Sequence, residues 1–191
     1  MLTSVQKIQL IVAMTAKGHS LIGATNEANG PRADELYREY CLSFETRLKN
    51  FFNQWNNRGA DFDNVFGNQC VDVFKYYNHD VIGGPPVKGN AIDYWEKYPK
   101  THYVRVVNTI TAIPKPGDVA IFEASKVLPL GHIGVVNWAN LFIVNIFEQN
   151  WPVQGYYDSK GNFIGTGKCH FRNHNYLSPK IKGWLHPIKH L

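Results

Sequence analysis

The hydrophobic period of this chain changes near residue 100, and this change limits the folds that the chain can adopt. Before it, apolar residues recur at the three- and four-residue intervals of helices. After it, apolar and polar residues alternate in short runs that are typical of strands. Because the helices precede the strands instead of alternating with them, we expect an α+β fold with an antiparallel sheet.

The composition is that of a globular protein. The 191 residues suffice for one domain with a hydrophobic core and an accessory segment. No apolar run approaches ~20 residues, so we expect no membrane span. The formal net charge of +5 indicates an anionic environment, but no nucleic-acid motif accompanies it. A nucleic-acid binder is therefore a hypothesis that rests on charge alone, and we expect no nucleic-acid partner.

The first part of the chain is predicted to be mostly helical. A short helix is expected over residues 3–16, and Gly18 would end it. The alternative, a signal peptide, would have a short apolar core. Residues 19–30 are expected to form a loop. From Pro31 to Trp55 an apolar stripe predicts a second, longer helix that lies on the protein's own core.

The remaining elements are predicted as short helices and strands. Residues 71–77 and 91–98 favour short helices, with a loop over 79–90 between them. Strands are expected at residues 103–107, 119–123, 132–138, 141–147, 162–170 and 181–186.

Cys70 is the first candidate for chemistry. It would stand at the N-terminus of the 71–77 helix, where free N–H groups and the helix dipole favour a thiolate. The chain has three cysteines, so at least one thiol stays unpaired. We interpret Cys41 as a small buried hydrophobe on a helix. Whether Cys41 and Cys169 pair is left open by the sequence.

A histidine and a carboxylate are expected to approach each other across a β-hairpin. Glu148 and, if the strand continues, Asn150 lie on one face of their strand, as His132 does on its own. Only residues 138–140 separate the two strands. The hairpin would bring His132 opposite Ile146 or Glu148, depending on the register. Taken alone, a histidine in a strand is more often structural.

Together these residues would support thiol acyl transfer. Cys70 would attack a carbonyl carbon, and His132 would take the thiol proton and later deliver one to the leaving amine. Glu148 or Asn150 would fix the imidazole tautomer. The side-chain amide of Gln69 would donate to the oxyanion, an interaction worth about 3 kcal/mol in the barrier. The alternative for Gln69 is a helix-capping or surface role.

The carboxylates before Cys70 form a separate signal, a spacing that resembles an EF-hand calcium loop. Positions 1, 3, 5, 7 and 12 of that loop correspond to Asp61, Asp63, Val65, Gly67 and Asp72. The match is imperfect, because position 6 is Phe66 instead of glycine. The alternative is that the aspartates form turns and that Asp72 compensates the helix dipole.

Five sequence blocks resemble a known family. They are Gly67-x-Gln69-Cys70-Val71-Asp72, Pro116-Gly117-Asp118, Gly131-His132-Ile133-Gly134, Glu148-Gln149-Asn150-Trp151, and His174-Asn175-Tyr176 with Gly183-Trp184-Leu185. From about residue 51 to the C-terminus, the chain resembles the CHAP domain, the cysteine, histidine-dependent amidohydrolase/peptidase of phage endolysins and bacterial cell-wall hydrolases. The resemblance implies a papain-like fold, with N-terminal helices packed on a C-terminal antiparallel sheet.

The resemblance also implies an activity and a site. The substrate would be bacterial peptidoglycan, cut in the stem peptide, in the cross-bridge or between muramic acid and L-alanine. The enzyme would thus be a cysteine endopeptidase or an N-acetylmuramoyl-L-alanine amidase. The family's nucleophile, base and orienting positions match Cys70, His132, Glu148 and Asn150. Some members bind Ca²⁺ just before the nucleophile, at positions that match Asp61, Asp63, Val65, Gly67 and Asp72.

We therefore expect residues 1–48 to be a helical extension and 49–191 to be the catalytic domain. A phage lysin would be made in the host cytoplasm and then act on the cell wall, reached through anionic wall polymers or a partner subunit. A secreted wall-remodelling hydrolase and a virion-associated lysin are alternatives with the same chemistry. A non-catalytic calcium-dependent wall-binding module is another, which the complete Cys70, His132, Glu148 and Asn150 set argues against.

Overall fold

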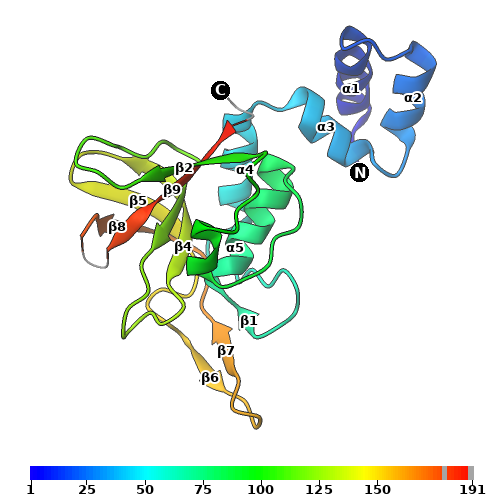
Figure 1. The fold of residues 1–191 in the computed structure, drawn as a ribbon. Helices are drawn as coiled ribbons and strands as arrows, with labels where there is room; N and C mark the ends of the chain where they lie inside the picture. The colour runs from blue at the N-terminus through cyan, green and yellow to red at the C-terminus, as the bar shows by residue number, and fades with distance from the viewer. Residues whose placement is uncertain (178–179, 189–191) are drawn as a thin grey trace. The chain divides into compact units, whose positions relative to one another are not determined.

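The computed structural model describes residues 1–177 and 180–188, without the side chains of residues 16 and 38–41. The chain divides into two compact units, Met1–Lys49 and Asn50–Leu191. Figure 1 shows helices in the first unit and both helices and sheets in the second. The predicted α+β class, with helices before an antiparallel sheet, is confirmed. No helix among the described residues has the length and apolar character needed to cross a bilayer.

Three helices make up most of the first unit. They are α1 (Ser4–Ala16), α2 (Leu21–Asn29) and α3 (Ala33–Cys41). Thr3 caps α1, because its Oγ1 accepts from the Gln6 N–H at 3.2 Å while the Gln6 side chain accepts from the Thr3 N–H at 2.8 Å. The buried core of this unit consists of Leu10, Met14, Ala24, Ala28 and Leu36.

Two of the expectations for the N-terminal region are wrong. The loop expected over residues 19–30 contains α2, which Ser20 caps by accepting from the Gly23 N–H at 3.1 Å. The single helix expected from Pro31 is instead two helices, α3 and α4 (Phe44–Trp55). Ser43 separates them, since its Oγ accepts from the Thr46 N–H and starts α4. The side chain of Cys41 lies outside the described residues.

A six-stranded antiparallel sheet dominates the second unit, in the order β2–β9–β3–β4–β5–β8 (Figure 1). Its strands are β2 (Tyr103–Val107), β3 (Val119–Phe122), β4 (His132–Ala139), β5 (Ile143–Glu148), β8 (His170–Asn175) and β9 (Ile181–Pro187). A smaller sheet joins β1 (Gly67–Asn68), β7 (Phe163–Thr166) and β6 (Gly155–Tyr157), with β1 parallel to β7. The helical elements are α5 (Cys70–Tyr77), a π-helical turn η1 (Asn78–Ile82) and a 3₁₀ helix η2 (Ala91–Trp95).

Most of the expected strands are confirmed within two residues, as β2, β3, β4, β5 and β9. The strand expected over 162–170 is wrong in extent, because β7 ends at Thr166 and β8 begins as a separate strand at His170. The helix expected over 71–77 is α5, which begins at Cys70. The loop expected over 79–90 begins with the turn η1, and the helix expected over 91–98 is the shorter η2.

Aromatic side chains pack α4 and α5 against one face of the large sheet. The rings of Phe51 and Phe52 lie 5.8 and 5.0 Å from the Phe147 ring of β5, between centroids. The Tyr77 ring of α5 lies 5.6 Å from Phe51. Because neighbouring residues of a strand face opposite ways, burying Phe147 under the helices directs Glu148 to the other face.

Replacing Phe147 with Ala is expected to lower the free energy of unfolding by about 3–5 kcal/mol, because the ring is fully buried among other aromatic rings. Phe142 is the matched control, since it lies in the turn between β4 and β5 and is 77% exposed. Phe142→Ala should change the stability by at most about 0.5 kcal/mol. Urea unfolding followed by circular dichroism measures both values, and equal losses would contradict the described packing.

Candidate active site

Cys70 is the first residue of α5, and contacts to its neighbour Gln69 hold the start of the helix. The Gln69 N–H donates to Asp72 Oδ2 at 3.0 Å, and the Asp72 N–H donates to the Gln69 carbonyl at 3.1 Å. The side chain of Gln149 donates to the same carbonyl at 2.9 Å. Cys70 itself is partly exposed. Its thiol stands at the positive end of the helix dipole.

His132 begins β4, and its Nε2 lies 2.9 Å from Glu148 Oε2 at the end of β5, in a hydrogen bond. Both side chains are buried, with 3% and 0% exposed. The Phe122 and Trp151 rings pack against the imidazole, with centroids 5.3 and 5.0 Å away. The predicted approach of a histidine and a carboxylate is therefore present, in a site that excludes water from the pair.

The register of the hairpin differs from both expected registers. It pairs Val135 with Phe147, and it shifts at a β-bulge between Val136 and Trp138. The prediction that His132 stands directly opposite Ile146 or Glu148 is therefore wrong. His132 reaches Glu148 diagonally across the strand pair. Gly134 faces β5 closely at this place, because a Cβ there would lie 2.5 Å from Ile146 Cγ2, 2.9 Å from the Phe147 carbonyl oxygen and 3.0 Å from Glu148 Cβ.

Glu148 has two further basic neighbours. His174 Nε2 lies 2.9 Å from Glu148 Oε1, and Arg172 Nε lies 3.3 Å from the same oxygen. Burial raises the pKa of the Glu148 carboxyl, but the hydrogen bonds from His132 and His174 outweigh it and leave that pKa lowered. Glu148 is thus a buried carboxylate that stays ionised.

The pKa of His132 reflects its contact with the nucleophile. Burial disfavours the imidazolium, but the charge and hydrogen bond of Cys70, together with those of Glu148, outweigh burial and raise the pKa of His132 to about 10. Cys70 therefore acts electrostatically on His132, which in turn is hydrogen-bonded to Glu148. The raised pKa favours the imidazolium form of His132, the form from which a general acid delivers a proton.

Asn150 and Gln69, the other predicted site residues, have backbone partners. Asn150 Oδ1 accepts from the Gln154 N–H at 2.8 Å and so holds the turn after β5. The Gln69 side-chain amide donates to the Phe66 carbonyl at 2.7 Å. Among the contacts of the described residues, Glu148 rather than Asn150 is the hydrogen-bond partner that orients His132.

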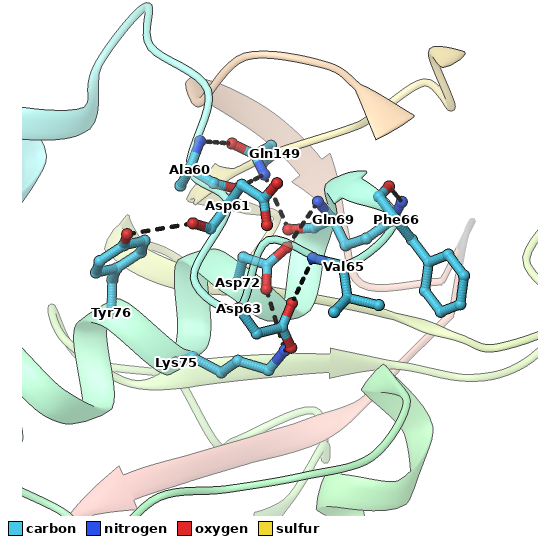
Figure 2. A network of polar contacts seen from close by, with 10 residues as sticks. All are labelled: Ala60, Asp61, Asp63, Val65, Phe66, Gln69, Asp72, Lys75, Tyr76 and Gln149. Carbon is cyan, nitrogen blue, oxygen red and sulfur yellow. Dashed lines mark hydrogen bonds and ion pairs between the residues drawn. The ribbon is translucent and has the colours of Figure 1, made fainter. Parts of the chain in front are cut away.

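Gln149 is a further residue of the site, whose role the sequence does not reveal. Its Oε1 accepts from the Ala60 N–H at 2.6 Å, and its Nε2 donates to the Ala60 carbonyl at 2.7 Å (Figure 2). The buried Cys169 thiol donates to the same Oε1 at 3.2 Å. Cys169 is a free cysteine, and burial raises the pKa of its thiol to about 12. The position of Gln149 beside Glu148 predicts that it faces the helices, but nothing in the sequence identifies Ala60 as its partner.

The predicted calcium loop brings its three aspartates together. Asp61, Asp63 and Asp72 each offer a ligand oxygen, and these atoms lie within 4.8 Å of one another. Asp61 Oδ1 is buried and has no hydrogen-bond partner in the described part of the chain. An unpartnered carboxylate oxygen in an acidic cluster is what a hard cation would satisfy, so the donor set fits Ca²⁺. The Lys75 ammonium contacts Asp63 and Asp72 from one side (Figure 2).

A cysteine at a helix N-terminus, a histidine on an antiparallel sheet and a carboxylate on the next strand define the class of cysteine–histidine proteins with a papain-like α+β fold. A scan of protein families matches the CHAP domain over residues 40–150, which include Cys70, His132 and Glu148. The match spans more than half of the chain. The chain therefore belongs to the CHAP domain family.

Similar proteins are endolysins. Endolysin PlyTW of Staphylococcus phage Twort is 31% identical over 131 residues, which are 64% of this chain and 28% of that protein. The chain thus spans about a quarter of that relative's length. The structure of the wild type endolysin LysIME-EF1 has a TM-score of 0.61 and 23% identity, over 76% of this chain and 64% of that one. The Ly7917 structure has a TM-score of 0.53 and 13% identity, over 76% and 63%. These two structures show a common fold.

In a nuclear magnetic resonance titration, we expect His132 to lose its proton near pH 10, and at a lower pH in Cys70→Ser, because serine supplies no negative charge. Since the folded-state pKa exceeds the ordinary value of 6.5, the stabilisation from this proton is complete below about pH 6.5 and is lost as the pH rises through about 10. Cys169→Ser is the control. An unchanged His132 pKa in Cys70→Ser would contradict the Cys70–His132 contact.

Proposed function

We propose that this chain hydrolyses an amide bond of bacterial peptidoglycan, as the lytic enzyme of a phage or prophage. Membership of the CHAP family and similarity to a phage endolysin support the proposal. The observation that carries it is the buried hydrogen bond between His132 and Glu148, together with the effect of Cys70 on the pKa of His132. Together these three side chains supply a nucleophile, a general base and an orienting carboxylate.

The reaction begins with attack of the Cys70 sulfur on the amide carbonyl carbon, which forms a tetrahedral intermediate. His132 then gives its proton to the leaving amine, and the C–N bond breaks to leave a thioester on Cys70. A water molecule that passes its proton to His132 attacks the thioester and releases the acid. Glu148 keeps the imidazole oriented and stabilises its charged form throughout.

Gln69 supplies a donor for the oxyanion. Its side-chain amide has two N–H groups, of which one bonds the Phe66 carbonyl and fixes the amide next to Cys70. The second N–H is the one that would meet the developing negative charge. The backbone N–H of Cys70, at the first position of α5, is a second donor.

The same chemistry serves a cysteine endopeptidase and an N-acetylmuramoyl-L-alanine amidase. The endopeptidase would cut the stem peptide or the cross-bridge, and the amidase would cut the bond between muramic acid and L-alanine. In either case the enzyme acts at the cell wall. A phage enzyme would reach the wall from the host cytoplasm, and a secreted wall hydrolase would reach it from outside.

We also propose that the acidic loop binds calcium. The carboxylates of Asp61, Asp63 and Asp72 and the backbone carbonyls of Val65 and Gly67 would hold the ion. It would supply positive charge that draws the carboxylates together and stiffens the loop before Cys70. The unpartnered Asp61 Oδ1 supports this assignment.

Digestion of purified peptidoglycan by the protein is expected to create new amino termini, which Cys70→Ala abolishes because the nucleophile is lost. Mass spectrometry of the fragments identifies the bond, since an endopeptidase and an amidase release products of different mass. Phe142→Ala, on an exposed side chain in the turn between β4 and β5, is the control that should cleave normally. The absence of new termini from walls of several chemotypes would contradict the proposed activity.

Gln69→Ala is expected to lower kcat by about 10²–10³-fold with a smaller change in KM, because an oxyanion donor acts mainly in the transition state. Steady-state cleavage of a soluble fragment of the identified peptidoglycan bond measures both constants. Gln69→Glu is the matched variant, which keeps the side-chain length but removes the N–H donors. Full activity in both variants would exclude Gln69 from the oxyanion site.

A further inference from the structure

The Lys75 side chain extends from α5 into the acidic loop (Figure 2). Its Nζ lies 2.6 Å from Asp63 Oδ2 and 3.1 Å from Asp72 Oδ1. The lysine side chain is only 11% exposed, and Asp72 is 1% exposed. The hydrogen bond from Lys75 holds the pKa of the Asp63 carboxyl below its ordinary value. The ammonium is therefore a buried cation inside the predicted metal loop.

Every oxygen of Asp63 and Asp72 already has a partner from the chain. Asp63 Oδ1 accepts from the Val65 N–H at 3.1 Å, and Lys75 occupies Oδ2. Asp72 Oδ2 accepts from the Gln69 N–H at 3.0 Å, and Lys75 occupies Oδ1. A metal ion that needs an oxygen from each residue must compete with one of these donors.

The two kinds of donor differ in how easily they can leave. The Val65 and Gln69 N–H groups belong to the backbone of the loop and of the helix cap, so removing them would unfold that backbone. Lys75 holds its ammonium on a flexible four-carbon stem that can turn toward solvent. Asp63 is 43% exposed, so water borders the contact that would break.

We propose that the Lys75 ammonium is the resident cation of this loop without calcium, and that Ca²⁺ binds by displacing it. The inference rests on the calcium assignment in the proposed function. Three carboxylates meet one ammonium in the cluster, so the ionised loop keeps an excess of negative charge. Ca²⁺ prefers six to eight oxygen ligands and would gain the oxygens that Lys75 releases, together with the unpartnered Asp61 Oδ1.

Displacement has two consequences. Calcium affinity is reduced, because binding must first break the two contacts of Lys75. The calcium-free loop stays attached to α5, because Lys75 already joins Asp63 to the helix that begins at Cys70. Calcium and lysine thus act as alternative ties between the loop and the nucleophile's helix.

Lys75→Met is the direct test, because methionine keeps much of the apolar stem and removes the ammonium. Calorimetric titration with CaCl₂ at pH 7 should show at least about tenfold tighter binding to Lys75→Met than to the wild type, the scale of breaking charge-assisted hydrogen bonds. Lys88→Met is the control, since it removes the same charge from an exposed loop position. Affinities of Lys75→Met and wild type within about twofold, or no calcium binding by either, would overturn the proposal.

A second measurement uses the wild-type chain and does not depend on a variant that folds. Brief acetylation with acetic anhydride, followed by mass spectrometry of peptides, reports the accessibility of each lysine. Lys75 should react slowly in chelator and at least several-fold faster with saturating CaCl₂, whereas Lys88 should not change. A Lys75 rate that calcium leaves unchanged or lowers would overturn the displacement.

The outcomes separate this inference from the proposed hydrolase activity. Tighter calcium binding by Lys75→Met supports displacement even in a chain that cleaves no peptidoglycan. Conversely, a chain that cleaves peptidoglycan through Cys70 but binds calcium equally with and without Lys75 overturns only the role of the lysine.

Discussion

The buried carboxylate of Glu148 is the group on which the geometry of the site depends. An ionised carboxylate removed from water costs several kcal/mol unless charged partners surround it. His132 and His174 approach it at 2.9 Å each, and Arg172 at 3.3 Å. Because these partners come from β4 and β8, the strands on either side of β5, the charge connects three strands at one place. Glu148 also bonds Nε2 of His132, so Nδ1 is the ring nitrogen that remains for Cys70.

The nearness of His132 and Glu148 was predictable because a short connection between two strands of the right period forces them to pair. The direct contact between the two side chains was not predictable. The β-bulge between Val136 and Trp138 shifts the pairing, and no residue of the hairpin indicates that shift. Gly134 lets the two strands approach closely here, because a Cβ at this position would meet Ile146, Phe147 and Glu148 of β5. Local pattern thus predicts which strands meet, whereas the register depends on a backbone irregularity.

Signals from a few residues or from distant parts of the chain also explain the wrong predictions in the helical region and the side-chain contacts that were not predicted. Ser20 and Ser43 each start a helix by accepting one backbone N–H. A single capping serine is a weak signal, which the small polar residues after Ser20 and the long apolar stripe around Ser43 outweigh in the sequence. Gln149 and Ala60 are 89 residues apart, so only the folded chain brings them together. Lys75 lies one helical turn after Asp72, a spacing that predicts their contact, but its reach to Asp63 depends on the path of the loop.

Gln149 explains how the acidic loop and the nucleophile can be linked. Its amide bonds the backbone of Ala60, at one end of the loop, and the carbonyl of Gln69, at the other end and next to Cys70. A side chain that is fully buried and bonded to three backbone groups holds both ends of the loop at a fixed separation. Whatever occupies the loop between them, ammonium or metal, therefore acts on a segment whose ends cannot move apart. Either occupant would contact Asp72, the one acidic ligand that belongs to α5, and so act on the helix that begins with Cys70.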